Sequence, residues 1–309
     1  MQRKRLQVPV LLSLLLLSPV SAAEATFGGH LKYFYTYTNF PDDSALSALA
    51  DPYRESLGNM RLKAEYRSGN WDGQVHYVLN GLYSNDLSDC ALRGGIIGSG
   101  CGRLSSDREQ LFDLSSVISE SDDSIVYQRL DRLVLAYSTE NMVARFGRQS
   151  ISWGNGMVYN PLDLFNPFPP EAIDTEYKSG DDMLYMQGLL SSGNDLQLLL
   201  IPRRKISTGE LSSTESALAG KYHRLGTDYE IDLLAAINYG DQIVGAAYTG
   251  EINENVLNAS LTLTRTDINE YWSAAANYNF STVLSNRNLT GFVELFYNGF
   301  GLSGDRYSV

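Results

Sequence analysis

Long apolar segments are absent from this chain beyond its N-terminal region. After residue 23, no window of 18 residues is free of Asp, Glu, Lys and Arg, whereas a transmembrane helix needs about 20 mostly apolar residues. A membrane protein without such helices has one alternative, the closed β-barrel, whose backbone groups are all paired within the sheet. The hydrophobic content of 43% fits a soluble protein and a barrel equally well, so the pattern of residues has to distinguish them.

Groups that enzymes use are scarce as well. The three histidines, His30, His76 and His223, lie on separate predicted strands, and one His on a strand is more often structural than catalytic. The chain contains no Gly-x-Ser-x-Gly turn, no His-Glu-x-x-His helix and no phosphate-binding glycine loop. We therefore expect no enzyme and no cofactor, with an outer-membrane enzyme assembled from distant strands as the least favoured alternative. We expect no metal site either, because the acidic run around Glu120 is typical of a solvated loop.

The first 23 residues have the pattern of a secretory signal. Arg3, Lys4 and Arg5 form a basic start, an apolar run follows over 8–17, and small residues follow that run. The apolar run is too short to span a bilayer. We therefore assign 1–23 as a signal peptide and 24–309 as the mature domain of an exported protein.

Basic residues are outnumbered by acidic ones in the mature domain. Without the three basic residues of the signal, 21 basic residues stand against 36 acidic ones, a net charge of −15. Nucleic-acid binding needs a basic surface, so nucleic acid is excluded as a partner. The acidic excess does not define a substrate, because surface loops are often acidic.

Only two cysteines are present, Cys90 and Cys101, with ten residues between them in a Gly-rich segment. In an exported chain such an even pair predicts a disulfide. Two ligands without a nearby His are too few for a metal site. Closing this short loop would stabilise the fold by about 3 kcal/mol.

What the chain does have is alternation of apolar and polar residues. In 270–280, one parity is apolar or aromatic: Trp272, Ala274, Ala276, Tyr278 and Phe280. The other parity is mostly polar, and 57–68 and 255–265 repeat the pattern. A period of two places the two sets on opposite faces of a strand. A membrane barrel turns its apolar face to lipid and its polar face to a wet interior, with aromatic girdles at both interfaces, which suits the 20 tyrosines.

The pattern predicts an all-β, antiparallel transmembrane barrel with thirteen visible strands. They are 25–39, 57–68, 72–84, 126–138, 142–152, 182–191, 195–203, 217–226, 228–239, 241–250, 255–265, 270–280 and 290–302. The alternation is weakest in 126–138, where Arg129, Asp131, Leu133 and Leu135 share a parity. Because bacterial barrels have even strand numbers, we expect one or more closing strands beyond this sequence, with a miscounted strand as the alternative.

The predicted connections divide by length. The early odd ones are long (40–56, 85–125, 153–181 and 204–216), and the even ones are short turns (68–70, 138–140, 191–194 and 225–227). Long loops outside the cell and short turns in the periplasm are typical of outer-membrane barrels. The rule weakens after residue 239, where the odd connections are short too.

The connection 153–181 breaks the alternation. It combines Asn-Pro and Pro-Pro steps, which disfavour regular structure, with apolar residues such as Val158, Leu162 and Phe165. Such a loop should cover a surface, and the barrel lumen is the nearest one. Alternatively, the Pro steps only fix turns, and Trp153 belongs to an aromatic girdle.

This region resembles porin-like outer-membrane barrels of Gram-negative bacteria. The string Gly-Arg-Gln (147–149), then Trp-Gly (153–154), then Asn-Pro-Leu-Asp (160–163) is similar to a signature of poorly characterised porin families, including alginate-export-like ones. The resemblance is specific over roughly 145–185. It implies that 153–181 folds inward and narrows a channel in the outer membrane.

The candidate pore-lining residues follow from this resemblance and from strand parity. They are Arg61, Lys63, Glu65 and Arg67 on the second strand, and Arg145, Arg148, Asp163, Asp174, Glu176, Lys178, Asp181 and Asp182 around the loop. Arg145 and Arg148 differ in parity, so both can point inward only if a bulge separates them. Because both signs of charge are present, selectivity stays open.

The function indicated is passive diffusion of small hydrophilic solutes through an outer-membrane porin. Its surroundings would be outer-membrane lipid and lipopolysaccharide, and a homo-oligomer is an open possibility. The alternative function is a barrel that acts as a sleeve for a periplasmic partner or an export complex.

The disulfide can be tested by alkylation and mass spectrometry of the purified protein. We expect Cys90 and Cys101 to gain two alkyl adducts only after reduction. Labelling of both thiols in the unreduced protein would show that the bridge is absent.

Overall fold

The alternating segments form β-strands that pair antiparallel in one sheet. The structure is a computed structural model that describes residues 23–39, 52–85, 107–168 and 175–301. Within these residues the sheet has 14 strands: β1 (Glu24–Thr38), β2 (Tyr53–Ser68), β3 (Trp71–Ser84), β4 (Ser115–Glu120), β5 (Ser124–Ser138), β6 (Met142–Gln149), β7 (Asp181–Leu189), β8 (Asp195–Arg204), β9 (Leu211–Leu225), β10 (Tyr229–Asn238), β11 (Asp241–Ile252), β12 (Asn255–Arg265), β13 (Glu270–Leu284) and β14 (Arg287–Asn298). The predicted all-β antiparallel class is confirmed. Each of the thirteen predicted strands corresponds to one of these, and β4 was missed.

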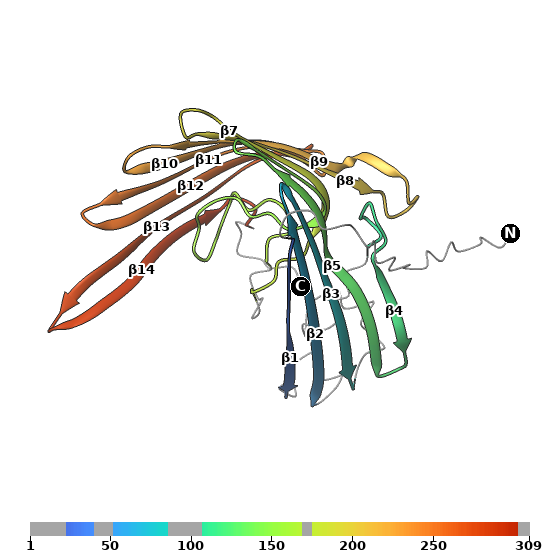
Figure 1. The fold of residues 1–309 in the computed structure, drawn as a ribbon. Helices are drawn as coiled ribbons and strands as arrows, with labels where there is room; N and C mark the ends of the chain where they lie inside the picture. The colour runs from blue at the N-terminus through green and yellow to red at the C-terminus, as the bar shows by residue number, and fades with distance from the viewer. Residues whose placement is uncertain (1–22, 40–51, 86–106, 169–174, 302–309) are drawn as a thin grey trace.

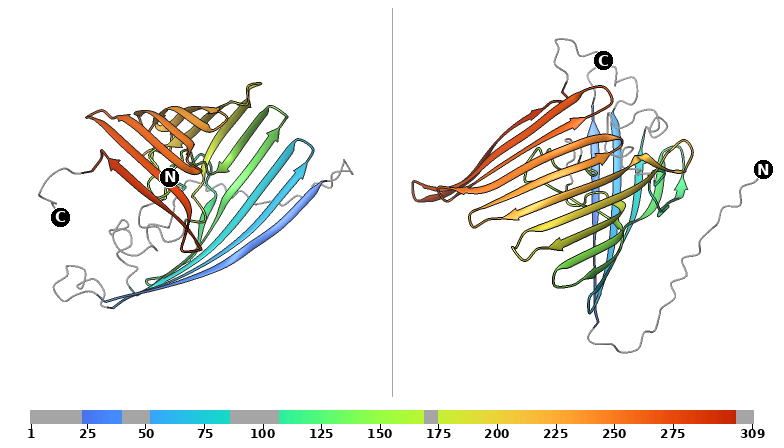
Figure 2. Two further views of the ribbon diagram at one scale, coloured as in Figure 1. Left: turned by 90° about the vertical axis from the view of Figure 1, so that its left-hand side faces the viewer. Right: turned by 90° about the horizontal axis from the view of Figure 1, so that it is seen from above.

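The strands are joined in the simplest order. Every strand pairs with its neighbour in sequence, except that β4 is paired only with β5, and β3 pairs with β5 across it. Figures 1 and 2 show the sheet curving so that β1–β5 and β7–β14 form two wings around a common hollow side. In the described part of the chain β1 and β14 are not paired with each other, so the sheet is open along these two edges.

The two faces of the sheet have opposite polarity. On β12 and β13, Leu261 and Trp272 lie exposed on the convex face, whereas Thr262, Ser273 and Asn277 are buried on the concave face. Soluble proteins normally bury apolar residues and expose polar ones. The predicted alternation is therefore confirmed, with the apolar set on the outside.

A β-bulge explains the irregular parity of β5. Strand β3 pairs with the residues on either side of Asp131 but skips Asp131 itself, and an extra residue of this kind exchanges the faces beyond it. Arg129, Asp131 and Arg132 are consequently all buried, while Leu135, four residues beyond Asp131, is 55% exposed on the convex face. The weak alternation of this segment was thus a local change of register within a real strand.

The connections at one end of the sheet are all short, whereas those at the other end vary in length. At one end they are turns of two to five residues: 69–70, 139–141, 190–194, 226–228, 253–254 and 285–286. Asn253 and Glu254 have φ values of 51° and 64°, which is the left-handed geometry of a tight hairpin. The opposite end carries the long connections, including the one between β6 and β7, and also the short connections 239–240 and 266–269, as predicted for the chain after residue 239. The predicted short turns are confirmed.

Several predictions concern residues outside this description. The described residues do not include 1–22 of the predicted signal peptide, Cys90, Cys101 or Asp174. The signal peptide, the disulfide and the pore-lining role of Asp174 therefore stay predictions. In the part of the chain that is described, no helix is long and apolar enough to cross a membrane.

Gly147 on β6 has a backbone geometry that only glycine adopts easily. Its φ is 116°, and a Cβ there would lie 2.0 Å from the carbonyl oxygen of Leu133. Gly147→Ala should therefore destabilise the sheet by roughly 1–3 kcal/mol, measured as the urea midpoint in detergent micelles. Gly73→Ala, where a Cβ would meet nothing within 4 Å, is the matched control. Equal urea midpoints for the two variants would contradict the requirement for glycine at position 147.

Candidate functional site

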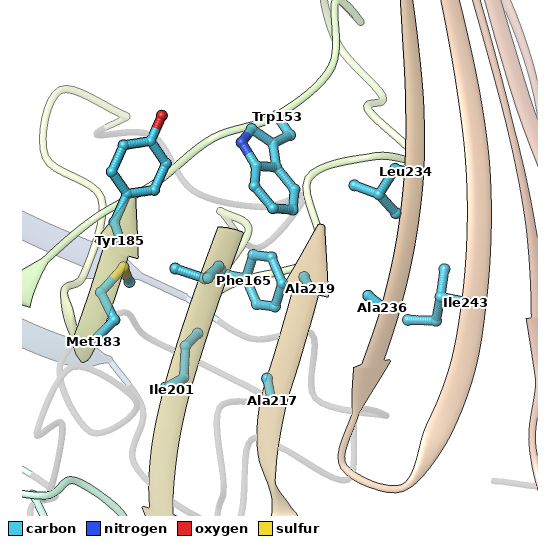
Figure 3. Packing of buried hydrophobic residues seen from close by; sticks show 11 residues of the cluster. Trp153, Phe165, Met183, Tyr185, Ile201, Ala217, Ala219, Leu234, Ala236 and Ile243 are labelled. Carbon is cyan, nitrogen blue, oxygen red and sulfur yellow. The ribbon is translucent and has the colours of Figure 1, made fainter. Parts of the chain in front are cut away.

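The connection between β6 and β7 lies on the concave face of the sheet. Its residues Trp153 and Phe165 are buried, and their rings meet edge to face with centroids 5.5 Å apart. They pack on inward-facing residues of five consecutive strands, β7 to β11: Met183, Tyr185, Leu199, Ile201, Ala217, Ala219, Leu234, Ala236 and Ile243. Figure 3 shows the two loop rings standing against this row of strands. We call the described residues of this connection the inner loop, with 150–168 as its first limb and 175–180 as its second limb.

The concave face under the inner loop is apolar, contrary to the expectation of a wholly polar interior. Strand β8 shows this best, since Leu198 and Leu200 point outward while Leu199 and Ile201 are buried beneath the loop. The sequence signal was the uninterrupted apolar run of β8, because a strand covered on both faces loses its alternation. The Trp153 indole N–H is satisfied by Gln197 Oε1 at 2.8 Å, as a buried Trp requires.

A tight turn shapes the first limb of the inner loop. Gly154 has φ of 94°, and a Cβ at this position would lie 2.1 Å from the Asn160 side-chain oxygen. The Asn160 amide donates to the Trp153 carbonyl at 2.9 Å, which closes the turn. The Trp-Gly and Asn-Pro elements of the sequence signature are therefore in contact.

Two of the predicted charges hold the base of the inner loop together. The Lys178 ammonium donates to the Asp163 carboxylate, to the Ile151 carbonyl at 2.6 Å and to the Ser152 hydroxyl at 3.1 Å. Burial raises the pKa of Asp163 and lowers that of Lys178, although each partner favours the charged form of the other. The pair ties the first limb to the second.

The second limb of the inner loop contacts the opposite wing. The ring of Tyr177 lies 3.9 Å from the Arg61 guanidinium carbon and 4.4 Å from the Lys63 ammonium, which is cation–π geometry. Glu176 forms an ion pair with Lys32 of β1 at 2.5 Å. The inner loop thus reaches both wings of the sheet.

Buried ion pairs surround the ends of β6 and β7. Arg148 is 0% exposed and donates to Asp182 at 2.9 Å and to Asp107 at 2.8 Å. Asp181 pairs with Arg203 at 3.2 Å. Residues 107–114 fill the space beyond these short strands, since Leu114 and Glu109 accept backbone hydrogen bonds from β5 and β8. Removing one partner would leave an uncompensated buried charge, which is strongly destabilising.

The remaining predicted residues are more open to the hollow side. Lys63 and Arg145 are partly buried, and Glu65 and Arg67 are exposed, with Arg67 paired to Asp72 at 2.6 Å. Arg145 lies over the Tyr185 ring at 4.5 Å. No bulge separates Arg145 from Arg148 in the pairing of β6 with its neighbours, so the condition for both to point inward is not met.

Several residues of the site were missed by sequence reasoning. The Arg61 partner Asp131, at 2.6 Å, depends on the bulge in β5. Asp107 lies in a connection whose position the alternation does not predict. Glu294 on β14 contacts the inner loop across more than 130 residues of sequence. Its one signal was its place as the single acidic residue of β14.

Comparison with known proteins adds remote likenesses only. No protein-family model matches the chain, and no curated protein matches it. It is similar to the solved structure of Pseudomonas aeruginosa OccK9 (OpdG), with 12% identity and a TM-score of 0.46 over 91% of this chain and 69% of that chain. It is also similar to a BenF-like porin from Pseudomonas fluorescens Pf-5, with 11% identity and a TM-score of 0.43 over 89% and 67% of the two chains.

A third similar structure is P. aeruginosa OpdK with vanillate, with 11% identity and a TM-score of 0.41 over 89% of this chain and 66% of that one. Likenesses at these TM-scores assign neither a fold nor a function to this chain, so the assignment has to rest on its own geometry. The resemblance to alginate-export-like families finds no match among them and stays a prediction.

The apolar contact of the inner loop can be tested by truncation. Phe165→Ala should lower the free energy of unfolding by about 3–5 kcal/mol, since it removes a buried ring and leaves a cavity. Val158→Ala, in the same loop but 77% exposed, should change it by less than about 0.5 kcal/mol. Urea titration in detergent micelles measures both. A Phe165→Ala protein as stable as Val158→Ala would mean that the loop is not packed on the sheet.

Proposed function

We propose that this chain forms a porin-like channel in the outer membrane for passive diffusion of small hydrophilic solutes, with the inner loop as its constriction. One observation carries the proposal: a curved sheet with an apolar convex face and a largely polar concave face has a loop folded across its hollow side. Passive diffusion through such a channel needs no catalytic step and no cofactor.

The convex face supports a lipid environment. Large apolar side chains are exposed there on consecutive strands, among them Leu62, Leu135, Phe146, Leu184, Leu198, Leu218, Leu233, Val244, Leu261, Trp272 and Val293. Contiguous exposed apolar surface on this scale is unusual for a water-soluble monomer and suits a membrane interface. Lipid and lipopolysaccharide would cover it, and a homo-oligomer stays a prediction.

Aromatic residues near the strand ends support the same orientation. Trp71 and Tyr137 are in contact at the short-turn end, with ring centroids 4.8 Å apart, and Tyr35 and Tyr83 are exposed near the opposite end. Girdles of this kind flank the apolar band of outer-membrane barrels. The short turns would then face the periplasm.

A channel requires the sheet to close, since open edges leave backbone groups unpaired within the membrane. We propose that the gap between the edges of β1 and β14 is closed in the membrane-embedded protein by the strand or strands expected beyond this sequence, so that the concave face becomes the wall of a lumen. The inner loop, which already contacts β2 and β11, would cross that lumen.

The predicted pore residues then divide into two groups. Lys63, Glu65, Arg67 and Arg145 keep exposed surface on the hollow side and are the proposed lumen-lining charges. The rest of the described set holds the loop and strand ends through pairs that are buried or loop-bound: Arg61, Arg148, Asp163, Glu176, Lys178, Asp181 and Asp182. Both groups carry both signs of charge, and selectivity is left unassigned.

The sleeve for a periplasmic partner is the second candidate. A sleeve needs an empty bore that accepts a protein, whereas here the inner loop occupies the concave face of β7–β11 and contacts the other wing. This arrangement favours the channel.

Planar-bilayer recording tests the proposal. The purified protein should give steady open steps, and replacing 157–166 by a short Gly-Ser linker should raise the unit conductance because it removes part of the constriction. Ile268→Ala, which truncates an 85% exposed side chain in the connection between β12 and β13, should leave the conductance unchanged. A silent protein that co-purifies with a periplasmic partner would overturn the channel, and an unchanged conductance after the replacement would place the loop outside the pore.

A further inference from the structure

The tip of the inner loop, residues 155–159, is held by one carboxylate on β14. The backbone N–H of Met157 donates to Glu294 Oε2 at 2.9 Å, and that of Val158 donates to Oε1 at 3.1 Å. The N–H of Tyr159 donates to Oε1 at 2.8 Å. Three consecutive amides therefore converge on both oxygens of a single side chain from the opposite end of the sheet.

A ladder of amide side chains supports this carboxylate. Asn277 on β13 donates to Glu294 Oε2 at 3.3 Å and to the Asn155 carbonyl at 3.3 Å. Asn258 donates to Asn277 Oδ1 at 2.8 Å, and the Asn155 amide reaches Thr249 Oγ1 at 2.8 Å. The loop tip is thus attached to four consecutive strands, β11 to β14, through polar groups on the concave face.

Apolar burial does not hold this part of the loop. Met157 and Val158 are 55% and 77% exposed, so their side chains contribute little to packing. Among the described residues, the ring contact of this part of the loop is between Tyr159 and Phe296, with centroids 5.0 Å apart. Hydrogen bonds to an ionised acceptor are about twice as strong as neutral ones, so the carboxylate is the dominant anchor of the tip.

We propose that Glu294 is a positioning residue that fixes the tip of the inner loop across the lumen and thereby sets the width of the constriction. This inference rests on the proposed channel for its consequence but not for the contact itself. The Trp153–Phe165 contact and the Lys178–Asp163 pair hold the base of the loop independently. Loss of the Glu294 carboxylate should therefore release the tip without unfolding the protein.

Glu294→Gln tests the carboxylate most directly. It keeps the shape of the side chain and replaces one acceptor oxygen by an NH₂ group, which cannot accept hydrogen bonds from the backbone amides. Glu140→Gln is the matched control. Glu140 is exposed in the short turn between β5 and β6, and this turn is not part of β11–β14, the strands to which the loop tip is attached.

The position of the tip is measured by cross-linking in the full-length protein. Tyr159→Cys and Phe296→Cys are combined in the unaltered, Glu294→Gln and Glu140→Gln backgrounds and treated with a short thiol-specific cross-linker. Mass spectrometry of the 159–296 linked peptide separates this product from any pair formed by the native cysteines. We expect a several-fold lower yield in the Glu294→Gln background alone. Equal yields in all three backgrounds would overturn the proposal.

Bilayer recordings of Glu294→Gln and Glu140→Gln, without the added cysteines, give the second readout. We expect Glu294→Gln to show fluctuating steps with a larger mean conductance, and Glu140→Gln to behave like the unaltered protein. If the cross-link yield falls but no form of the protein conducts, the channel fails while the anchoring role stands. If the channel conducts and neither the yield nor the current changes, the anchoring role fails while the channel stands.

Discussion

The burial of Trp153 and Phe165 against the concave face of β7–β11 is the contact on which the interior of this protein depends. An irregular segment carries unpaired backbone groups and gains little from local hydrogen bonds, so it needs tertiary contacts to keep one conformation. Here two aromatic rings provide an apolar anchor, and the sheet accommodates them with small residues such as Ala217 and Ala219 beneath. Once the rings are placed, the polar contacts at the base, the tip and the second limb fall within reach of their partners.

The distribution of charge follows from the same arrangement. Where the inner loop and residues 107–114 cover the sheet, charges occur as closed pairs such as Arg148 with Asp182. Where the wall is uncovered, Glu65 and Arg67 keep contact with the hollow side. A buried pair adds little net stability compared with apolar residues of the same size, yet breaking it is costly. These pairs therefore favour one arrangement of the loop over others more than they add to the stability of the sheet.

Sequence reasoning recovered the strands because a period of two is a local property that each strand repeats. It recovered the short turns for the same reason, since residues such as Gly69 and Asn70 indicate a turn by themselves. From the apolar composition of the inner loop it predicted that the loop covers the lumen; the loop packs on the concave face of β7–β11, and the lumen itself stays a proposal. It could not predict which strands the loop packs on, because the partners Leu199 and Ile201 belong to β8, where apolar residues occupy both faces of the strand. Glu294 and Asp107 were missed because their roles depend on contacts far away in sequence, and β4 because it is only six residues long.

The extra residue Asp131 in β5 has a consequence for how related chains should be compared. In most strands a length change of one residue exchanges the inner and outer faces. In β5 the ladder already absorbs one residue at this point. A relative without the bulge would lack one residue in the middle of this strand. Its equivalents of Leu133 and Leu135 would still face lipid, but they would be an odd number of residues, not an even number, from the equivalent of Arg129. An alignment that allows no gap inside strands would therefore place polar residues of such a relative at the lipid-facing positions of β5.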